Sequence, residues 1–153
     1  MVHVLCFGNP LHGDDGFGLQ VHAALKPGIA GRAARLFEVG LRGIDALPLF
    51  DGCDRAILVD ALDDPEEIPG TIKILHGASI PHAAEGAGHA CGVSWLLQAL
   101  AATHCSPPSV TLIGAVIGKV APFSGELSPQ LARQVRPVSD RILAMLPTEP
   151  ANG

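Results

Sequence analysis

The sequence has no apolar run long enough to cross a membrane. Its longest apolar stretch runs from Val110 to Ile117 and has the length of a β-strand, whereas a membrane-spanning helix needs about 20 apolar residues. The N-terminus also lacks a basic segment followed by an apolar one, which is the pattern of a secretory signal peptide. We therefore expect a protein that does not associate with membranes and that works in the cytoplasm.

Basic residues and paired cysteines are also scarce. The 10 Lys and Arg residues face 15 Asp and Glu residues, which gives a net charge of −5. Because binding to phosphates needs a basic surface, this balance argues against a nucleic-acid partner. The four cysteines, Cys6, Cys53, Cys91 and Cys105, contain no C-x-x-C pair. We expect them to be reduced and mostly buried rather than to hold a structural zinc ion.

What the chain does have is enough apolar material for one packed domain. Its 153 residues are 48% hydrophobic, and a chain of this length usually forms a single core. We place that domain at residues 1–146 and expect residues 147–153 to be a frayed tail. We expect the protein to be a monomer that docks only transiently on another protein.

Strand-like and helix-like segments alternate along the chain. The apolar patterns predict strands at 2–7, 35–39, 55–60, 70–75 and 109–118. Helices are predicted at 18–26, at 43–50 with an interruption at Pro48, at 92–102, and from Pro129 toward Met145 with a kink or split at Pro137. This alternation indicates an α/β fold with a mostly parallel sheet covered on both faces. Ligands of such sheets bind beyond the carboxyl ends of the strands.

The first predicted strand leads into a glycine-rich loop, "CFGNPLHGDDGFG", from Cys6 to Gly18. Such a turn between strand and helix often binds phosphate, and Glu38 lies about where a ribose-binding acid would stand. The loop does not match G-x-G-x-x-G or the P-loop with its Lys, and the carboxylates of Asp14 and Asp15 would repel phosphate. The loop therefore disfavours nucleotide binding.

Two carboxylates and one imidazole are expected at the carboxyl edge of the sheet. Asp15 lies in the loop after the first strand, Asp60 ends the apolar run "AILVD", and His89 precedes the helix at 92–102. This mixed set of oxygen and nitrogen ligands suits nickel, zinc, iron or manganese. Each residue also has an ordinary interpretation, because an Asp can cap a turn or a helix and a loop His can simply be solvated.

Five motifs occur in the same order as in the hydrogenase maturation proteases, which trim the C-terminus of the large subunit of nickel–iron hydrogenases. The sequence resembles that family at Gly8–Gly18, Phe37–Asp64, Pro69–Ile72, Gly88–Leu100 and Ser124–Pro129. The resemblance implies a three-layer α/β/α fold and an endopeptidase that acts on the large-subunit precursor.

The resemblance also implies a metal-binding trio, which falls on Asp15, Asp60 and His89 in this chain. In the family this trio is understood to engage nickel already installed in the precursor, so the metal is supplied by the substrate, and other divalent ions could substitute. Asp14 would then cap the turn or orient Asp15.

The chain departs from the family where many relatives carry a Gly-Thr pair. Its segment from Glu38 to Gly43 has an acid and glycines but no Thr, and Arg42 could meet an acid or the C-terminal carboxylate of the substrate, or be solvated. His12 could be an extra ligand, a proton carrier or a surface residue. The residues predicted to bind substrate are Gly13, Asp14, Glu38, Gly40 and Arg42.

No nucleophile is evident, because the chain has neither G-x-S-x-G nor H-E-x-x-H, and Cys6 and Cys91 have no activating context. We therefore expect metal-assisted hydrolysis in which Asp15 or Asp60 accepts the proton. In a second interpretation the trio only senses nickel and other residues cut. Two alternative functions remain: a non-catalytic docking module or nickel chaperone for the precursor, and a metal-dependent hydrolase of small molecules.

Overall fold

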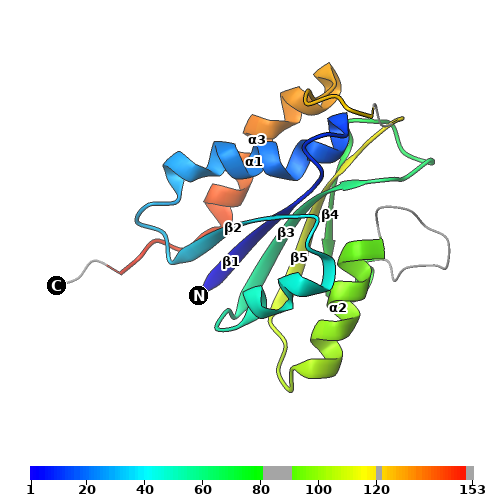
Figure 1. The fold of residues 1–153 in the computed structure, drawn as a ribbon. Coiled ribbons are helices and arrows are strands. Elements are labelled where there is room, and N and C mark those ends of the chain that lie inside the picture. The colour runs from blue at the N-terminus through cyan, green and yellow to red at the C-terminus, as the bar shows by residue number, and fades with distance from the viewer. Residues whose placement is uncertain (81–90, 120–121, 151–153) are drawn as a thin grey trace.

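The computed structural model describes residues 1–80, 91–119 and 122–150 and shows a five-stranded sheet between two layers of helices (Figure 1). The strands are β1 (Val2–Phe7), β2 (Ala34–Gly40), β3 (Arg55–Leu62), β4 (Ile72–His76) and β5 (Ser109–Val116). They lie in the order β2-β1-β3-β5-β4, and every neighbouring pair is parallel except β4 with β5. The predicted α/β class with a mostly parallel sheet is confirmed.

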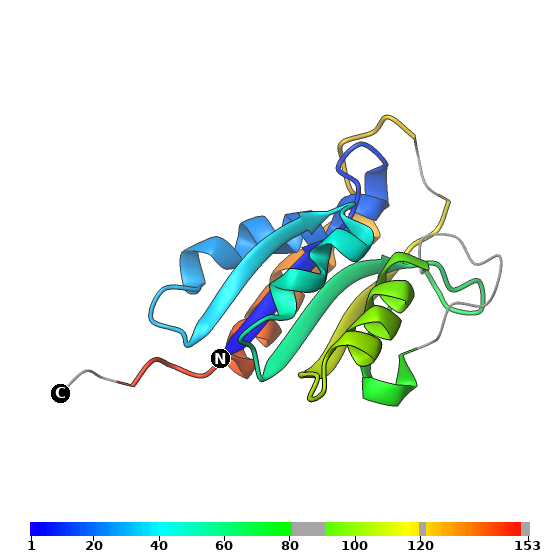
Figure 2. The ribbon, with the colours of Figure 1, turned by 60° about the horizontal axis from the view of Figure 1, so that its bottom comes forward.

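The helices cover the two faces of the sheet (Figures 1 and 2). They are α1 (Phe17–Leu25), α2 (Cys91–Thr103) and α3 (Pro129–Met145), with 3₁₀ turns η1 (Gly13–Gly16), η2 (Lys26–Gly28), η3 (Gly43–Phe50) and η4 (Gly77–Ser79). One face packs against α1 and α3, and the other packs against α2 and η3. None of the helices among the described residues is long and apolar enough to span a bilayer.

Burial on both faces explains why the central strands are apolar throughout. All six residues of β1 are buried. Along β3, Ile57 and Val59 belong to the core under α1 and α3, whereas Ala56 and Leu58 belong to the core under α2 and η3. Alternate side chains of a strand point to opposite faces, so a strand covered on both sides reads as a continuous apolar run.

Three differences between the predicted elements and the structure have a clear physical cause or involve a proline. β3 does not end at Asp60 but continues to Leu62, because its ladder with β5 extends to the pair Leu62 and Val116. Residues 43–50 form one 3₁₀ helix that contains Pro48. α3 is a single helix through Pro137, which lies on the exposed side, where water can bond the carbonyl that loses its partner.

The chain after α3 returns along the amino end of the sheet. Ala33 donates a backbone hydrogen bond to Pro147, and Glu149 donates one to Gly31. Arg32 also bonds the carbonyl of Leu146 through its guanidinium, at 3.1 Å. Residues 147–149 of the expected tail are therefore held by main-chain bonds, and residues 151–153 lie outside the described part of the chain.

Candidate active site

A small cavity of about 100 Å³ lies at the carboxyl edge of the parallel strands. Its lining comes from five parts of the chain, namely the end of β1, η1, the end of β2 with the start of η3, β3, and α2. The lining residues are Phe7, Gly8, Asp15, Gly40, Leu41, Gly43, Asp60 and Val93. The structure thus brings two of the predicted carboxylates, Asp15 and Asp60, into one cavity.

Main-chain contacts hold Asp15 in this cavity. The N–H of Asp15 donates to the carbonyl of His12, and the carbonyl of Asp15 accepts from the N–H of Asn9, each at 3.1 Å. Gly8 has φ +145, and a Cβ on it would lie 2.4 Å from the carbonyl oxygen of Asp15. Only glycine fits that approach, so Gly8 lets the loop fold back and bury the side chain of Asp15.

A second glycine brings the loop against the sheet. A Cβ on Gly18, in the first turn of α1, would lie 2.1 Å from the carbonyl oxygen of Phe7 and 2.7 Å from that of Val59. The helix therefore touches the backbones of β1 and β3 at this point. That contact sets η1, with Asp15, beside the part of β3 that carries Asp60.

Asp60 projects from within β3 toward the face covered by α2 and η3. Its neighbours Val59 and Ala61 point into the opposite core, and alternate strand residues face opposite ways. Its Oδ1 accepts the N–H of Ala61 at 2.8 Å. Burial raises the pKa of Asp60 to about 7; the Ala61 N–H lowers this pKa and the charge of Asp15 raises it. A cation between the two carboxylates would favour the ionised form.

The donor set fits a divalent cation, as far as the described residues define it. Asp60 shares one small cavity with Asp15, whose charge helps to raise the pKa of Asp60, so a positive charge there would favour the ionised form of Asp60. Among the described residues no group of three or more His, Cys, Asp or Glu side chains could hold a metal ion. The third predicted ligand, His89, lies outside the described residues, and Val93, four residues after it in the chain, lines the cavity.

Asp14 and Gly13 fasten the loop of Asp15 to the segment before α3. Oδ1 of Asp14 accepts the N–H of Ser128 at 2.6 Å, and the N–H of Gly13 donates to the carbonyl of Ser124 at 2.7 Å. Both were predicted to bind substrate. Their recorded contacts support the loop, so Asp14 acts on Asp15 by holding the main chain between them.

The other predicted substrate-binding residues, on β2 and just after it, differ in whether they line the cavity. Gly40, with φ +62, lines the cavity, and its carbonyl accepts the N–H of Gly8 at 3.1 Å. Glu38 instead lies 3.4 Å from Nδ1 of His22 on α1, outside the cavity lining. Burial lowers the pKa of His22 despite this carboxylate. Arg42 is exposed at the start of η3, next to the cavity residue Leu41.

Sequence reasoning missed the apolar part of the cavity. Phe7, Leu41 and Val93 line it beside the carboxylates. Phe7 and Val93 were assigned to a strand and a helix, and periodicity cannot tell which end of a buried element opens into a cavity. His12, which could have been an extra ligand, a proton carrier or a surface residue, packs its ring edge-on against that of Phe123, with 6.4 Å between the ring centroids.

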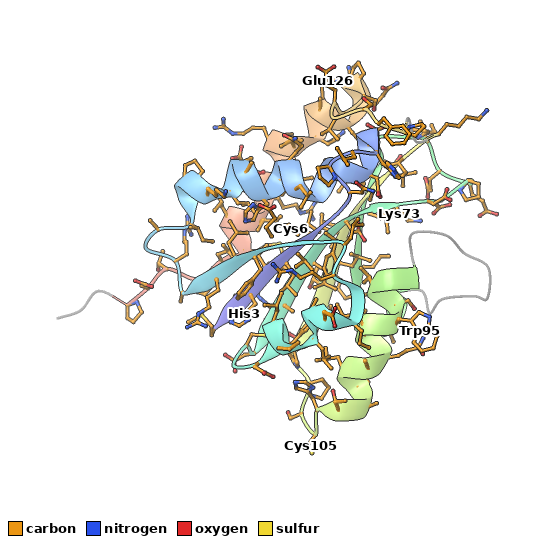
Figure 3. The ribbon with its side chains drawn as sticks, viewed as in Figure 1. His3, Cys6, Lys73, Trp95, Cys105 and Glu126 are labelled. Atoms are coloured by element: carbon orange, nitrogen blue, oxygen red, sulfur yellow. The ribbon has the colours of Figure 1, made fainter. Side chains whose placement is uncertain are left out.

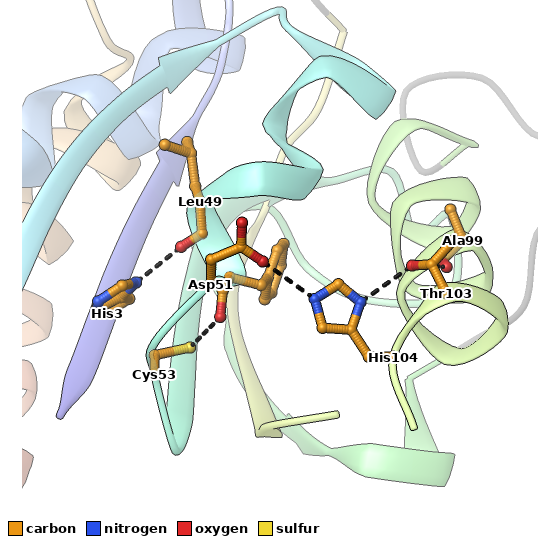
Figure 4. Close-up of polar contacts among 8 residues, drawn as sticks. His3, Leu49, Asp51, Cys53, Ala99, Thr103 and His104 are labelled. Carbon is orange, nitrogen blue, oxygen red and sulfur yellow. Dashed lines mark hydrogen bonds and ion pairs between the residues drawn. The ribbon is translucent and has the colours of Figure 1, made fainter. Parts of the chain in front are cut away.

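A Thr–His–Asp arrangement at the far end of α2 resembles a hydrolytic triad (Figure 4). It differs from one because the hydroxyl proton of the Thr is not directed at the His. Nδ1 of His104 lies 3.0 Å from Oγ1 of Thr103, and Nε2 lies 3.3 Å from Oδ1 of Asp51. The hydroxyl of Thr103 donates its one proton to the carbonyl of Ala99 at 2.8 Å. It can only accept from His104, so these contacts join α2 to the loop after η3 rather than activate Thr103.

Comparison with known proteins gives the family. A model described as hydrogenase maturation protease (HycI) matches residues 19–145, which is most of the chain. The chain belongs to the hydrogenase maturation protease family. Relatives of this family are named as proteases and endopeptidases, so the protein is a peptidase.

Individual relatives agree with this assignment. The hydrogenase 2 maturation protease of Escherichia coli (strain K12) is 28% identical over 146 residues, which cover 94% of this chain and 88% of that protein. The hydrogenase expression/formation protein HupD of Thiocapsa roseopersicina is 28% identical over 147 residues, 94% of this chain and 66% of that protein.

Solved structures of the family share the whole architecture. The hydrogenase maturating endopeptidase HybD from E. coli has a TM-score of 0.82 at 25% identity and covers 98% of this chain and 97% of that chain. The [NiFe] hydrogenase maturation protease HybD from Thermococcus kodakarensis has a TM-score of 0.77 at 23% identity, covering 94% and 97%, and supports the fold.

Proposed function

We propose that this protein removes a C-terminal peptide from the precursor of a nickel–iron hydrogenase large subunit and recognises nickel carried by that precursor. The observation that carries the proposal is the pair of buried carboxylates, Asp15 and Asp60, in one cavity at the carboxyl edge of the sheet. The name of the E. coli relative, a hydrogenase 2 maturation protease, supports the choice of substrate.

The size of the cavity supports a metal that arrives with the substrate. At about 100 Å³ it has room for an ion and a few atoms around it but not for a peptide. The nickel ion of the precursor would be held by Asp15 and Asp60, with His89 as the third ligand. Gly8 and Gly40 line the same cavity, and the absence of side chains there lets a partner approach the backbone closely.

Proton transfer is the step that the chain's own residues can perform. A divalent ion at this position would polarise the scissile carbonyl. Asp60, where it is not fully committed to the metal, would accept a proton from the attacking water and return it to the leaving amine. Asp15 is the other carboxylate within the cavity and holds the same role if Asp60 is committed to the metal.

We also propose that the protein works as a monomer in the cytoplasm and docks transiently on the precursor. Size-exclusion chromatography with light scattering tests the oligomeric state.

The experiment is intact-mass analysis of the nickel-loaded precursor after incubation with the protein, with the nickel-free precursor in parallel. We expect loss of a C-terminal peptide with the wild type only when nickel is present. The variants Asp15→Asn, Asp60→Asn and His89→Ala should each lose at least about a hundredfold in rate. Thr103→Ala, a change outside the cavity, is the matched control and should keep the wild-type rate.

Three other results would change the proposal. Cleavage of the nickel-free precursor at the same rate would remove nickel recognition and keep the protease. A stable complex with no cleavage would favour a docking module or chaperone. Cleavage of small esters or free peptides with added metal, without any precursor, would favour a small-molecule hydrolase.

A further inference from the structure

Every parallel strand is followed by a loop that exposes a large apolar side chain. The described residues include seven large apolar side chains that are mostly or half exposed, and five of them lie in these four loops or, for Ile44, in the first turn of η3. Leu11 follows β1, Leu41 and Ile44 follow β2, Ile68 follows β3, and Phe123 follows β5. We call these five residues the apolar rim. The loops gather at the end of the molecule that holds Asp15 and Asp60 (Figures 1 and 2).

The rim is attached to the site by main-chain bonds. Ser124, the residue after Phe123, accepts the N–H of Gly13 at 2.7 Å and pairs with His12 in a parallel bridge. Leu11 lies in the same loop as Asp15, and Leu41 lines the cavity itself. The main chain at Phe123 and Leu11 is therefore joined to the loop of Asp15, and Leu41 lies in the cavity itself.

Phe123 combines an exposed apolar side chain with an unfavourable backbone conformation, and both cost free energy in the folded protein. Its side chain is 89% exposed, and its φ of +59 is the one positive value among the non-glycine residues that the structure describes. A left-handed backbone is unfavourable for a bulky residue, and exposure forfeits the gain from apolar burial. Its one recorded ring contact is edge-on with His12. Strain of this kind gathers where a residue contacts a ligand.

The small cavity requires recognition to take place outside it. A peptide segment or a protein surface cannot enter a space of about 100 Å³, so most of the contact with a protein substrate has to form around the opening. Interfaces of this kind rely on a few large apolar anchors.

We propose that the apolar rim is the docking surface for the folded body of the precursor, and that it binds an apolar patch surrounding the precursor's metal site. This inference rests on the proposed function, because it takes the precursor as the partner that brings the metal to Asp15 and Asp60. Phe123 and Leu11 are specificity-determining residues: they set how the precursor is placed over the cavity and take no part in proton transfer.

The test measures KM and kcat on the nickel-loaded precursor for the wild type and for Phe123→Gly and Leu11→Ser. We expect each variant to raise KM roughly tenfold or more with kcat changed less than about twofold. Glycine adopts a positive φ without strain, so Phe123→Gly should keep or raise the melting temperature. A residue needed only for folding would instead lower it.

The control is Trp95→Ser, which removes an exposed large side chain on the outer side of α2, away from the four loops (Figure 3). It should leave KM unchanged. If the rim variants keep the wild-type KM, or if Trp95→Ser raises KM as much as they do, the inference is overturned while the proposed function stands. If the wild type does not cleave the nickel-loaded precursor, the proposed function itself fails.

Discussion

The carboxyl group of Asp60 loses its hydration when the protein folds, because its position on β3 is buried. Burial dominates its environment, one N–H from Ala61 partly compensates, and the charge of Asp15 adds to the penalty. The group is therefore protonated at slightly acid pH in the free protein. A positive charge facing the cavity would lower this pKa, so ionisation of Asp60 is coupled to binding.

The contribution of Asp60 to the stability of the metal-free protein should fall as the pH rises from about 4 to 7. The folded pKa of about 7 lies above the ordinary value of 3.8, so the folded state binds the extra proton between these values and loses it at pH 7. The loss amounts to on the order of 4 kcal/mol in the free energy of unfolding. Asp60→Asn keeps an oxygen for the Ala61 N–H and should abolish this dependence, which urea unfolding across the pH range measures.

Parallel stability curves for the wild type and Asp60→Asn would show that Asp60 titrates normally in the folded protein. Adding nickel at pH 8 should stabilise the wild type more than the variant, because an ion that binds only the folded state shifts the unfolding equilibrium.

The residues of the site differ in how far the sequence predicts them. Asp15 and Asp60 could be expected near each other because each comes after an apolar run in the sequence, and the structure does place both in one cavity. Glu38 and Arg42 were expected there too, but β2 turns Glu38 toward His22, and Arg42 is exposed. The direction of a loop side chain depends on tertiary contacts that no local pattern contains.

At the scale of elements, the link between η1 and α3 is the feature that the sequence does not reveal. Asp14 and Ser128 are far apart in the chain, yet the carboxylate accepts the backbone N–H just before α3 at 2.6 Å. The strands β1 and β3 were predictable because both of their faces are buried and apolar. The antiparallel direction of β4 was not, since it depends on the pairing with β5.

Removal of the Asp14 side chain should loosen the loop that carries Asp15. Asp14→Ala leaves the N–H of Ser128 without its acceptor, and we expect a loss of about 1 to 2 kcal/mol in unfolding free energy and a lower kcat/KM. Asp14→Asn, which keeps the acceptor oxygen, should lie close to the wild type. Chemical unfolding and the precursor cleavage assay measure the two effects.

The control for this prediction is Asp140→Ala, which removes an exposed i,i+4 pair with Arg136 on α3. It should cost less than about 0.5 kcal/mol. If Asp14→Ala were equally mild in both assays, the link to Ser128 would not position Asp15.

At the scale of the whole molecule, the cysteine side chains differ in their exposure to solvent. Cys6 is fully buried in the centre of the sheet, Cys53 is partly buried and bonds the carbonyl of Phe50, and Cys105 is exposed. Burial raises the pKa of Cys6 far above its usual range, with further contributions from Glu38 and Asp60. The expectation that the cysteines are mostly buried is confirmed for Cys6 and is wrong for Cys105. The side chain of Cys91 lies outside the described part of the structure.

Alkylation of the native protein should therefore modify Cys105 first and Cys6 last. The thiolate is the reactive form, and Cys6 becomes available only when the sheet opens, so we expect its rate to be at least about a thousandfold slower than that of Cys105. Peptide mapping after timed labelling measures both rates, and labelling in urea should equalise them. Comparable rates in the native protein would mean that β1 opens locally.

The return of residues 147–149 along residues 31–33 has a practical consequence. It leaves residues 147–149, like Met1, at the amino end of the sheet, whereas the cavity lies at the carboxyl end (Figure 1). Eight residues of β3 separate the two ends, a distance of roughly 26 Å at the usual rise of a strand. A protein immobilised through its C-terminus on a sensor chip should thus present Asp15 and Asp60 to the solution, ready to capture a precursor.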